Sequence, residues 1–144
     1  MTAYGKSEVP VARSMHHIQS MLYDHDCEST RFTDTPEGFT IEFLRPVKRP
    51  DGVKKMVVSL PVRYDYAGCT TTLQKEQRKR TMWRSSFHYL KAMFDSIEKN
   101  IIPFEEAFLA NFVVELPDGT KGRVKNLVLP KALAEKQAVL SLGD

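Results

Sequence analysis

An apolar stripe along one long helical segment most strongly limits what this chain can fold into. Large side chains follow one another at steps of four, three, four and three residues: Trp83, Phe87, Leu90, Phe94 and Ile97. This spacing predicts an α-helix over residues 72–100 that buries one wide face. Thr71 with Gln74 three residues later matches a capping box, which begins a helix. The remaining chain must therefore supply a layer on which this face packs.

Before this helix the apolar period falls to two residues, which indicates half-buried strands. The predicted strands span residues 28–32, 39–43 and 56–62. The turn sequences Thr-Pro-Glu-Gly at 35–38 and Pro-Asp-Gly at 50–52 separate them and predict an antiparallel meander. Pro61 lacks a backbone N–H, so we expect its strand to lie at a sheet edge or to end there.

Apolar residues at helical spacing also occur before the predicted strands and after the long helix. Met15, Ile18 and Leu22 predict an amphipathic helix over residues 11–23. After the long helix we expect a helix over 103–114, a short strand over 124–129 and a closing helix over 131–140. The predicted fold class is α+β, namely helix, three-stranded antiparallel meander, long helix and a helical C-terminal extension. Residues 1–10 are a flexible lead, 11–100 the αβββα core and 101–144 the extension of one domain.

Length and composition fit one soluble domain. With 144 residues, of which 42% are hydrophobic and 27% charged, the chain is long enough to bury a core. Cys27 and Cys69 lack Cys-x-x-Cys spacing, which argues against a disulfide framework or a zinc knuckle, so we expect two reduced, buried or half-buried thiols. No apolar run approaches a membrane span, and no leader pattern opens the chain. We therefore expect a cytoplasmic protein with no membrane partner, in the host cell if the gene is viral.

Basic residues are concentrated in the middle of the chain. From Arg45 to Arg84 there are eleven Lys or Arg against three acidic residues, a local charge of +8, whereas the rest of the chain carries −5. The net charge of +3 therefore conceals a polarised molecule. A one-sided positive surface attracts polyanions, because each neutralised phosphate releases counterions from a nucleic acid.

One part of this charge lies on the connection between the second and third predicted strands. We call it the hairpin cluster: Arg45, Lys48, Arg49, Lys54 and Lys55. Paired strands can hold such a tip against a phosphate backbone. The alternative is a solvated loop whose cations protect a sheet edge from aggregation.

The other part lies at the start of the long helix. We call it the helix-end cluster: Lys75, Arg78, Lys79, Arg80 and Arg84. Cations there face the positive pole of the helix dipole, so an external anion accounts for them better than local stability does. The alternative is that Arg80 and Arg84 pair with acids such as Glu42 or Glu105. Arg63 completes the candidate nucleic-acid contacts, and we expect both clusters to form one continuous surface.

No residue set in the sequence specifies a reaction. His16 and His17 point about 100° apart on a helix, so they do not suit one metal ion together with His25. Tyr64 and Tyr66 stand outside a periodic segment and are candidates for base stacking, with packing in a linker as the alternative. We expect no catalytic residue, no metal and no cofactor.

Two resemblances add expectations. Residues 11–99, in the order helix, three antiparallel strands, helix, resemble the double-stranded RNA-binding domain, in which the basic start of the second helix, here residues 75–80, contacts phosphates. The chain departs from that family at the turn 35–38, where the family has a Gly-Pro-x-His type of loop, and in its long link over 63–70. Duplex RNA specificity is therefore not implied.

The second resemblance is to small uncharacterised proteins encoded by phages and mobile elements. It rests on Leu60-Pro61, residues 78–84, residues 104–109 and Leu116-Pro117-Asp118-Gly119. It implies a viral or prophage origin and carries no known activity.

We therefore predict a non-enzymatic nucleic-acid-binding protein of phage type that contacts DNA or RNA phosphates through both clusters, with little sequence specificity. The alternative is a protein-binding module or inhibitor whose basic surface docks on a host or phage protein. The apolar segments 104–114 and 133–142 suit either a closed monomer or a homodimer.

Overall fold

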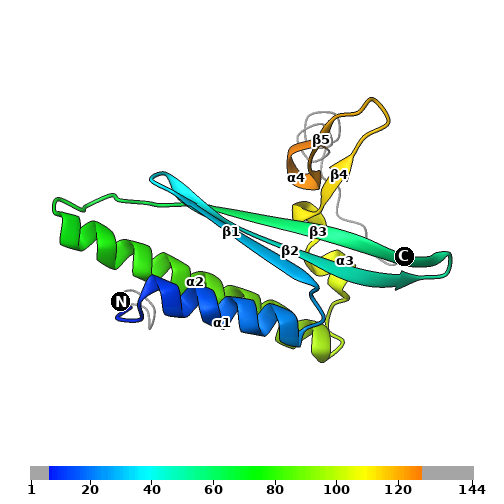
Figure 1. The fold of residues 1–144 in the computed structure, drawn as a ribbon, viewed down its shortest axis with the longest axis horizontal. Helices are drawn as coiled ribbons and strands as arrows, with labels where there is room; N and C mark the ends of the chain where they lie inside the picture. The colour runs from blue at the N-terminus through cyan, green and yellow to red at the C-terminus, as the bar shows by residue number, and fades with distance from the viewer. Residues whose placement is uncertain (1–6, 128–144) are drawn as a thin grey trace, which may run out of the picture.

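The predicted order of helix, three-stranded meander and long helix is confirmed by a computed structural model, which describes residues 7–127. The elements are α1 (Val11–Asp24), β1 (Ser29–Thr35), β2 (Gly38–Arg49), β3 (Gly52–Arg63) and α2 (Thr72–Glu98). The strands form an antiparallel sheet in the order β1-β2-β3, and α1 and α2 cover one face of it, running in the same direction (Figure 1). The fold class is α+β.

A C-terminal region of short elements packs beside β3. It contains α3 (Phe104–Ala107), a 3-10 turn η1 (Leu109–Asn111), β4 (Val113–Glu115), β5 (Lys121–Arg123) and α4 (Val124–Leu127). Phe112 forms a β-bridge with Val58, and the Asn111 side chain donates to the Ser59 carbonyl at 3.1 Å. These contacts hold the region against the β3 edge.

Two predictions for this region are wrong. The helix expected over 103–114 ends at Ala107, because the following chain pairs along β3 and then enters β4. The strand expected over 124–129 begins as α4, while the strand that pairs with β4 is β5. The helix expected over 131–140 lies outside the described residues.

Strands β2 and β3 are longer than their apolar alternation predicts. Their register runs from Gly38 opposite Arg63 to Arg49 opposite Gly52, whereas β1 pairs only as far as Leu44. Beyond Leu44 the two strands therefore continue as a two-stranded arm. Gly52 at its tip has a φ of +126°, a conformation that favours glycine. Because β3 is an edge strand, the position predicted from Pro61 is confirmed.

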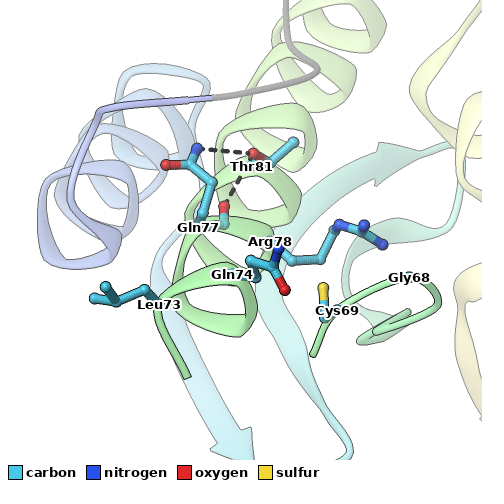
Figure 2. Close-up of a pocket in the computed structure, with 7 residues that line it drawn as sticks. All are labelled: Gly68, Cys69, Leu73, Gln74, Gln77, Arg78 and Thr81. Carbon is cyan, nitrogen blue, oxygen red and sulfur yellow. Dashed lines mark hydrogen bonds between the residues drawn. The ribbon is translucent and has the colours of Figure 1, made fainter. Parts of the chain in front are cut away.

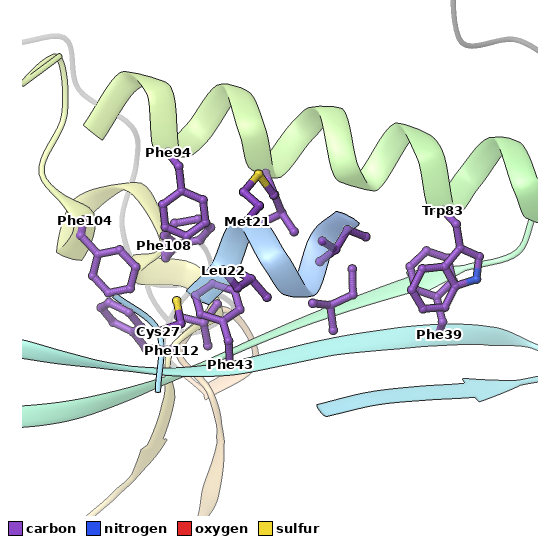
Figure 3. Close-up of a cluster of buried hydrophobic side chains, with 14 of the residues drawn as sticks. Met21, Leu22, Cys27, Phe39, Phe43, Trp83, Phe94, Phe104, Phe108 and Phe112 are labelled. Carbon is purple, nitrogen blue, oxygen red and sulfur yellow. The ribbon is translucent and has the colours of Figure 1, made fainter. Parts of the chain in front are cut away.

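The core lies between β2 and the apolar stripe of α2. Phe39, Ile41 and Phe43 on alternate positions of β2 are each no more than 2% exposed. Phe39 stacks on Trp83 with 3.9 Å between ring centroids, and at the other end of the layer Phe43 meets Phe94 and Phe108 (Figure 3). Burial of one such side chain stabilises the fold by roughly 1.5–3 kcal/mol. The predicted stripe is confirmed.

The start of α2 is fixed by local bonds. Thr71 Oγ1 accepts from the Gln74 N–H at 3.2 Å, and Gln74 Oε1 accepts from the Thr71 N–H at 3.1 Å. This reciprocal pair is the predicted capping box.

Little of the expected N-terminal lead is described, and its described part contacts α2. Ser7 is 8% exposed; its N–H donates to Thr81 Oγ1, and its carbonyl accepts from Gln77. Within residues 7–127, no helix combines the length and apolarity that crossing a bilayer requires.

A hydrogen-bond chain that runs from the buried Trp83 to the exposed Asp34 connects α2 to the sheet. Trp83 Nε1 donates to the Tyr64 hydroxyl at 2.8 Å, and that hydroxyl donates to Asp34 Oδ1 at 2.7 Å. Burial and the bond to Asp34 raise the pKa of Tyr64, so the phenol keeps its proton and donates. The chain fixes the N-terminal half of α2 over the end of β1.

The first prediction concerns this chain of bonds. Tyr64→Phe leaves the buried Trp83 N–H without its acceptor, and we expect a loss of about 1–3 kcal/mol in the free energy of unfolding, measured in urea. Tyr66→Phe is the control, because its hydroxyl bonds to nothing in the described part of the chain. Equal stability of the two variants would contradict the role of the Tyr64 hydroxyl.

A second prediction follows from Ser14 in α1. Its side chain is fully buried, and its Oγ has no hydrogen-bond partner among residues 7–127. Ser14→Ala removes this desolvated hydroxyl and should stabilise the protein by about 1 kcal/mol or more. The exposed Ser20→Ala variant should raise the free energy of unfolding by only about 0.5 kcal/mol or less, because alanine has the higher helix propensity. A destabilised Ser14→Ala would show that this hydroxyl is satisfied.

Candidate functional site

The two basic clusters lie at opposite ends of the molecule. The arm that carries the hairpin cluster points away from the end at which α2 begins (Figure 1). A strand of 12 residues separates Gly52 at the arm tip from Arg63, and at about 3.3 Å per residue it spans ~40 Å. The expected continuous surface is therefore wrong. Arg63, opposite Gly38 at the β1–β2 turn, instead shares an end with the helix-end cluster.

One flank of the helix-end cluster lies over the linker that follows β3. Lys79 Nζ is 5.2 Å from the centroid of the Tyr64 ring, and Lys75 Nζ is 5.7 Å from that of Tyr66. The two tyrosine rings stack with 5.7 Å between centroids. These contacts favour packing in a linker over base stacking, and they hold two ammonium groups in fixed positions.

Arg78 holds the same linker through its backbone. Its Nη1 donates to the Asp65 carbonyl at 2.6 Å and its Nη2 to the Ala67 carbonyl at 3.1 Å. A guanidinium carries five N–H donors. The two bonds to neutral carbonyls therefore leave three donors, and the full positive charge, for an anion.

The other flank of the cluster faces α1 and the N-terminal residues. Arg80 donates to the Ser7 carbonyl at 3.4 Å and to Gln77 at 2.6 Å. Arg84 Nη1 lies 2.8 Å from His17 Nδ1, and its guanidinium lies 4.3 Å from the Phe87 centroid. The expected alternative of pairing with acids is therefore wrong for these two arginines.

The helix-end cluster and Arg63 form no ion pair with a carboxylate anywhere in the described 7–127 range. Glu42, one acid considered for them, pairs instead with Arg31 at 2.7 Å. Elsewhere cations do find acids: Lys54 lies 3.4 Å from Asp51, and Lys55 lies 3.0 Å from Glu28. The cations at the end of the molecule where α2 begins thus form no direct ion pair within residues 7–127, although Asp65 and Glu76 lie nearby in the sequence.

A groove of about 460 Å³ between α1 and α2 is lined by Arg84, Lys91 and His17 together with two acids, Asp24 and Asp95, of which Asp95 pairs with Lys91 at 3.4 Å. The pKa of His17 is lowered from 6.5 by burial and then by Arg84, His16 and Arg13. Sequence analysis considered His17 only as a metal ligand and did not place it or Arg13 beside the helix-end cluster, because the fold decides which helix faces lie together. Their spacing of four residues on α1 was the available signal.

A hollow of about 450 Å³ opens beside the first turns of α2, between the linker and the helix (Figure 2). Gly68, Cys69, Gln74 and Arg78 are among its lining residues. Leu73 at its rim is 76% exposed. The lining contains no paired acid and base with which to carry out a reaction.

The hairpin cluster contains cations in different environments. The Arg45 guanidinium lies 4.4 Å from the Phe104 centroid, and its Nη1 is buried with no partner among the described residues. Arg45 therefore contributes to packing between the arm and α3. Lys48 and Arg49 at the tip are exposed.

The thiols and histidines do not assemble into a reactive site. Cys27 is buried and Cys69 half-buried, and both are free, as predicted. Burial raises the pKa of Cys27 to about 12, so its reactive thiolate is scarce at neutral pH. His25 stacks on Phe94 and contacts Glu98 at 3.2 Å. Residues 7–127 contain no group of three or more side chains that could hold a metal ion.

Comparisons with known proteins, by family model, by sequence against curated proteins and by structure against solved structures, found no match.

The bond between Arg84 and His17 predicts a pH dependence of stability. Because the pKa of His17 is lowered in the folded state, the unfolded chain binds more protons below about pH 6.5. Stability should therefore fall as the pH drops through that value. His17→Gln keeps an acceptor for Arg84 and should reduce the slope of the profile between about pH 7.5 and about pH 5, measured by urea unfolding. Part of the slope should remain, because burial also lowers the pKa of His88. An unchanged slope in His17→Gln would contradict the assignment.

Proposed function

We propose that this protein is a non-enzymatic nucleic-acid-binding protein that contacts backbone phosphates with Arg63 and the helix-end cluster. The observation that supports this most directly is that six cations, five in the N-terminal half of α2 and Arg63 at the end of β3, form no ion pair with a carboxylate of residues 7–127. Like charges on neighbouring turns of a helix repel one another, and Lys75 in the first turn also faces the positive pole of the helix dipole. An external polyanion relieves this repulsion, and its binding releases counterions.

The contacts within the chain suit the cluster to this role. The tyrosine rings of the linker fix two lysines, and carbonyl groups fix Arg78 without cancelling its charge. Ordering long side chains before binding lowers the entropy that binding costs. The surface is therefore arranged in advance for an anionic ligand.

The same contacts favour weak sequence specificity. Phosphate contacts position a protein on a nucleic acid but do not distinguish bases. Tyr64 and Tyr66, the candidates for stacking, are engaged with each other and with lysines. We infer binding to the backbone rather than recognition of a base sequence.

The type of nucleic acid is part of the test. The order of helix, three strands and helix resembles the double-stranded RNA-binding domain, but the turn 35–38 and the link 63–70 depart from that family, so duplex RNA specificity is not implied. Duplex RNA, duplex DNA and single strands are therefore tested side by side. A phage origin and a cytoplasmic location, in the host cell, belong to the same proposal.

The test is a salt titration. Arg63→Gln with Lys75→Gln should weaken binding to a fluorescent duplex and reduce the slope of log affinity against log salt by about 1 for each residue. Fluorescence anisotropy over a range of sodium chloride concentrations measures both quantities. Lys99→Gln with Lys125→Gln is the control, because it removes the same charge at exposed positions outside the cluster.

Two outcomes would contradict the proposal. One is that the control pair lowers the slope as much as the cluster pair does. The other is that no duplex or single strand binds even at low salt, which would favour the alternative of a protein-binding module for an acidic partner.

A further inference from the structure

The arm formed by β2 and β3 is an exposed, strongly charged element that the proposed binding surface does not use. Its segment from Arg45 to Lys55 contains five cations against one acid, Asp51. Lys48 and Arg49 at the tip are exposed and form no ion pair with any carboxylate of residues 7–127. Resting on the proposed function, we infer that this arm is a second phosphate-binding surface, so that one molecule bridges two separate nucleic-acid segments.

The two surfaces are far apart in the folded protein. They lie at opposite ends of the long dimension of the molecule (Figure 1). A strand and a helix of 12 and 27 residues lie between those ends, and each spans ~40 Å. The Debye length at physiological salt is only about 8 Å. The two surfaces therefore attract polyanions independently.

The two surfaces also point in opposite directions. The arm tip and the N-terminus of α2 point away from each other along the long dimension (Figure 1). A single straight duplex could contact both ends only by lying along the whole length of the molecule. Two segments, one at each end, satisfy both surfaces.

The arm is held in place by strand pairing and by packing on α3. Val47 is 7% exposed, and Arg45 packs on Phe104, which is 5% exposed. The β2–β3 register continues without a break to Arg49 opposite Gly52. The tip cations are thus held on a paired, packed support, which distinguishes them from cations on an irregular loop.

The experiment uses duplexes of about one helical turn, roughly 10 base pairs, which are too short to reach both ends. One pool carries a donor dye and the other an acceptor dye, and the full-length protein is added at low salt. We expect energy transfer between duplexes, with native mass spectrometry showing one protein and two duplexes in the complex.

Lys48→Glu with Arg49→Glu should abolish the energy transfer and leave complexes of one protein and one duplex. The affinity of that remaining contact should stay within about twofold, because the helix-end cluster is distant. Lys99→Glu with Lys125→Glu, the matched control, should keep the energy transfer.

Three results would overturn the inference. A complex of one protein and one duplex without energy transfer in the unmodified protein refutes the second surface but leaves the proposed function intact. Complexes of two proteins and two duplexes would assign bridging to self-association instead of the arm. Failure of every duplex to bind would remove the proposed function together with the inference.

Discussion

The hydrogen-bond chain from the Trp83 indole through the Tyr64 hydroxyl to Asp34 determines where the charged surfaces lie. It joins the long helix, the linker and the first strand at one point in the core. Because Phe39 stacks on the same indole, the helix can neither slide along the sheet nor rotate on it without losing both contacts. The first turns of α2 are therefore fixed beside the β1–β2 turn, and the cations that ring this helix start are fixed with them.

Topology explains why two clusters that are close in sequence are far apart in space. The chain leaves the arm tip through the whole of β3 before the linker and α2 begin. An antiparallel hairpin thus carries the later cluster one strand length away from the earlier one. The segment from Arg45 to Arg84 has a net charge of +8, and the folded protein carries its two basic clusters at opposite ends of an elongated body.

Periodicity predicted the elements that build the core. The stripe through Trp83 and Phe94, the alternation in β2 and the box at Thr71 each express a local rule that the tertiary structure also obeys. The region after Pro103 does not follow its local pattern, because pairing of Phe112 with the β3 edge outweighs helix propensity. For the site, sequence identified every cation but not their directions. Apolar alternation stops at Phe43 and resumes at Met56, so it did not reveal that pairing continues through the charged arm.

The two cysteines occupy environments that differ in chemical access. Cys27 lies in the core, whereas Cys69 lines the hollow beside Arg78. A thiol-reactive probe at neutral pH therefore alkylates Cys69 and spares Cys27, since alkylation requires the thiolate. The native chain thus accepts a single reporter group at the end where its longest helix begins, with no engineered cysteine needed.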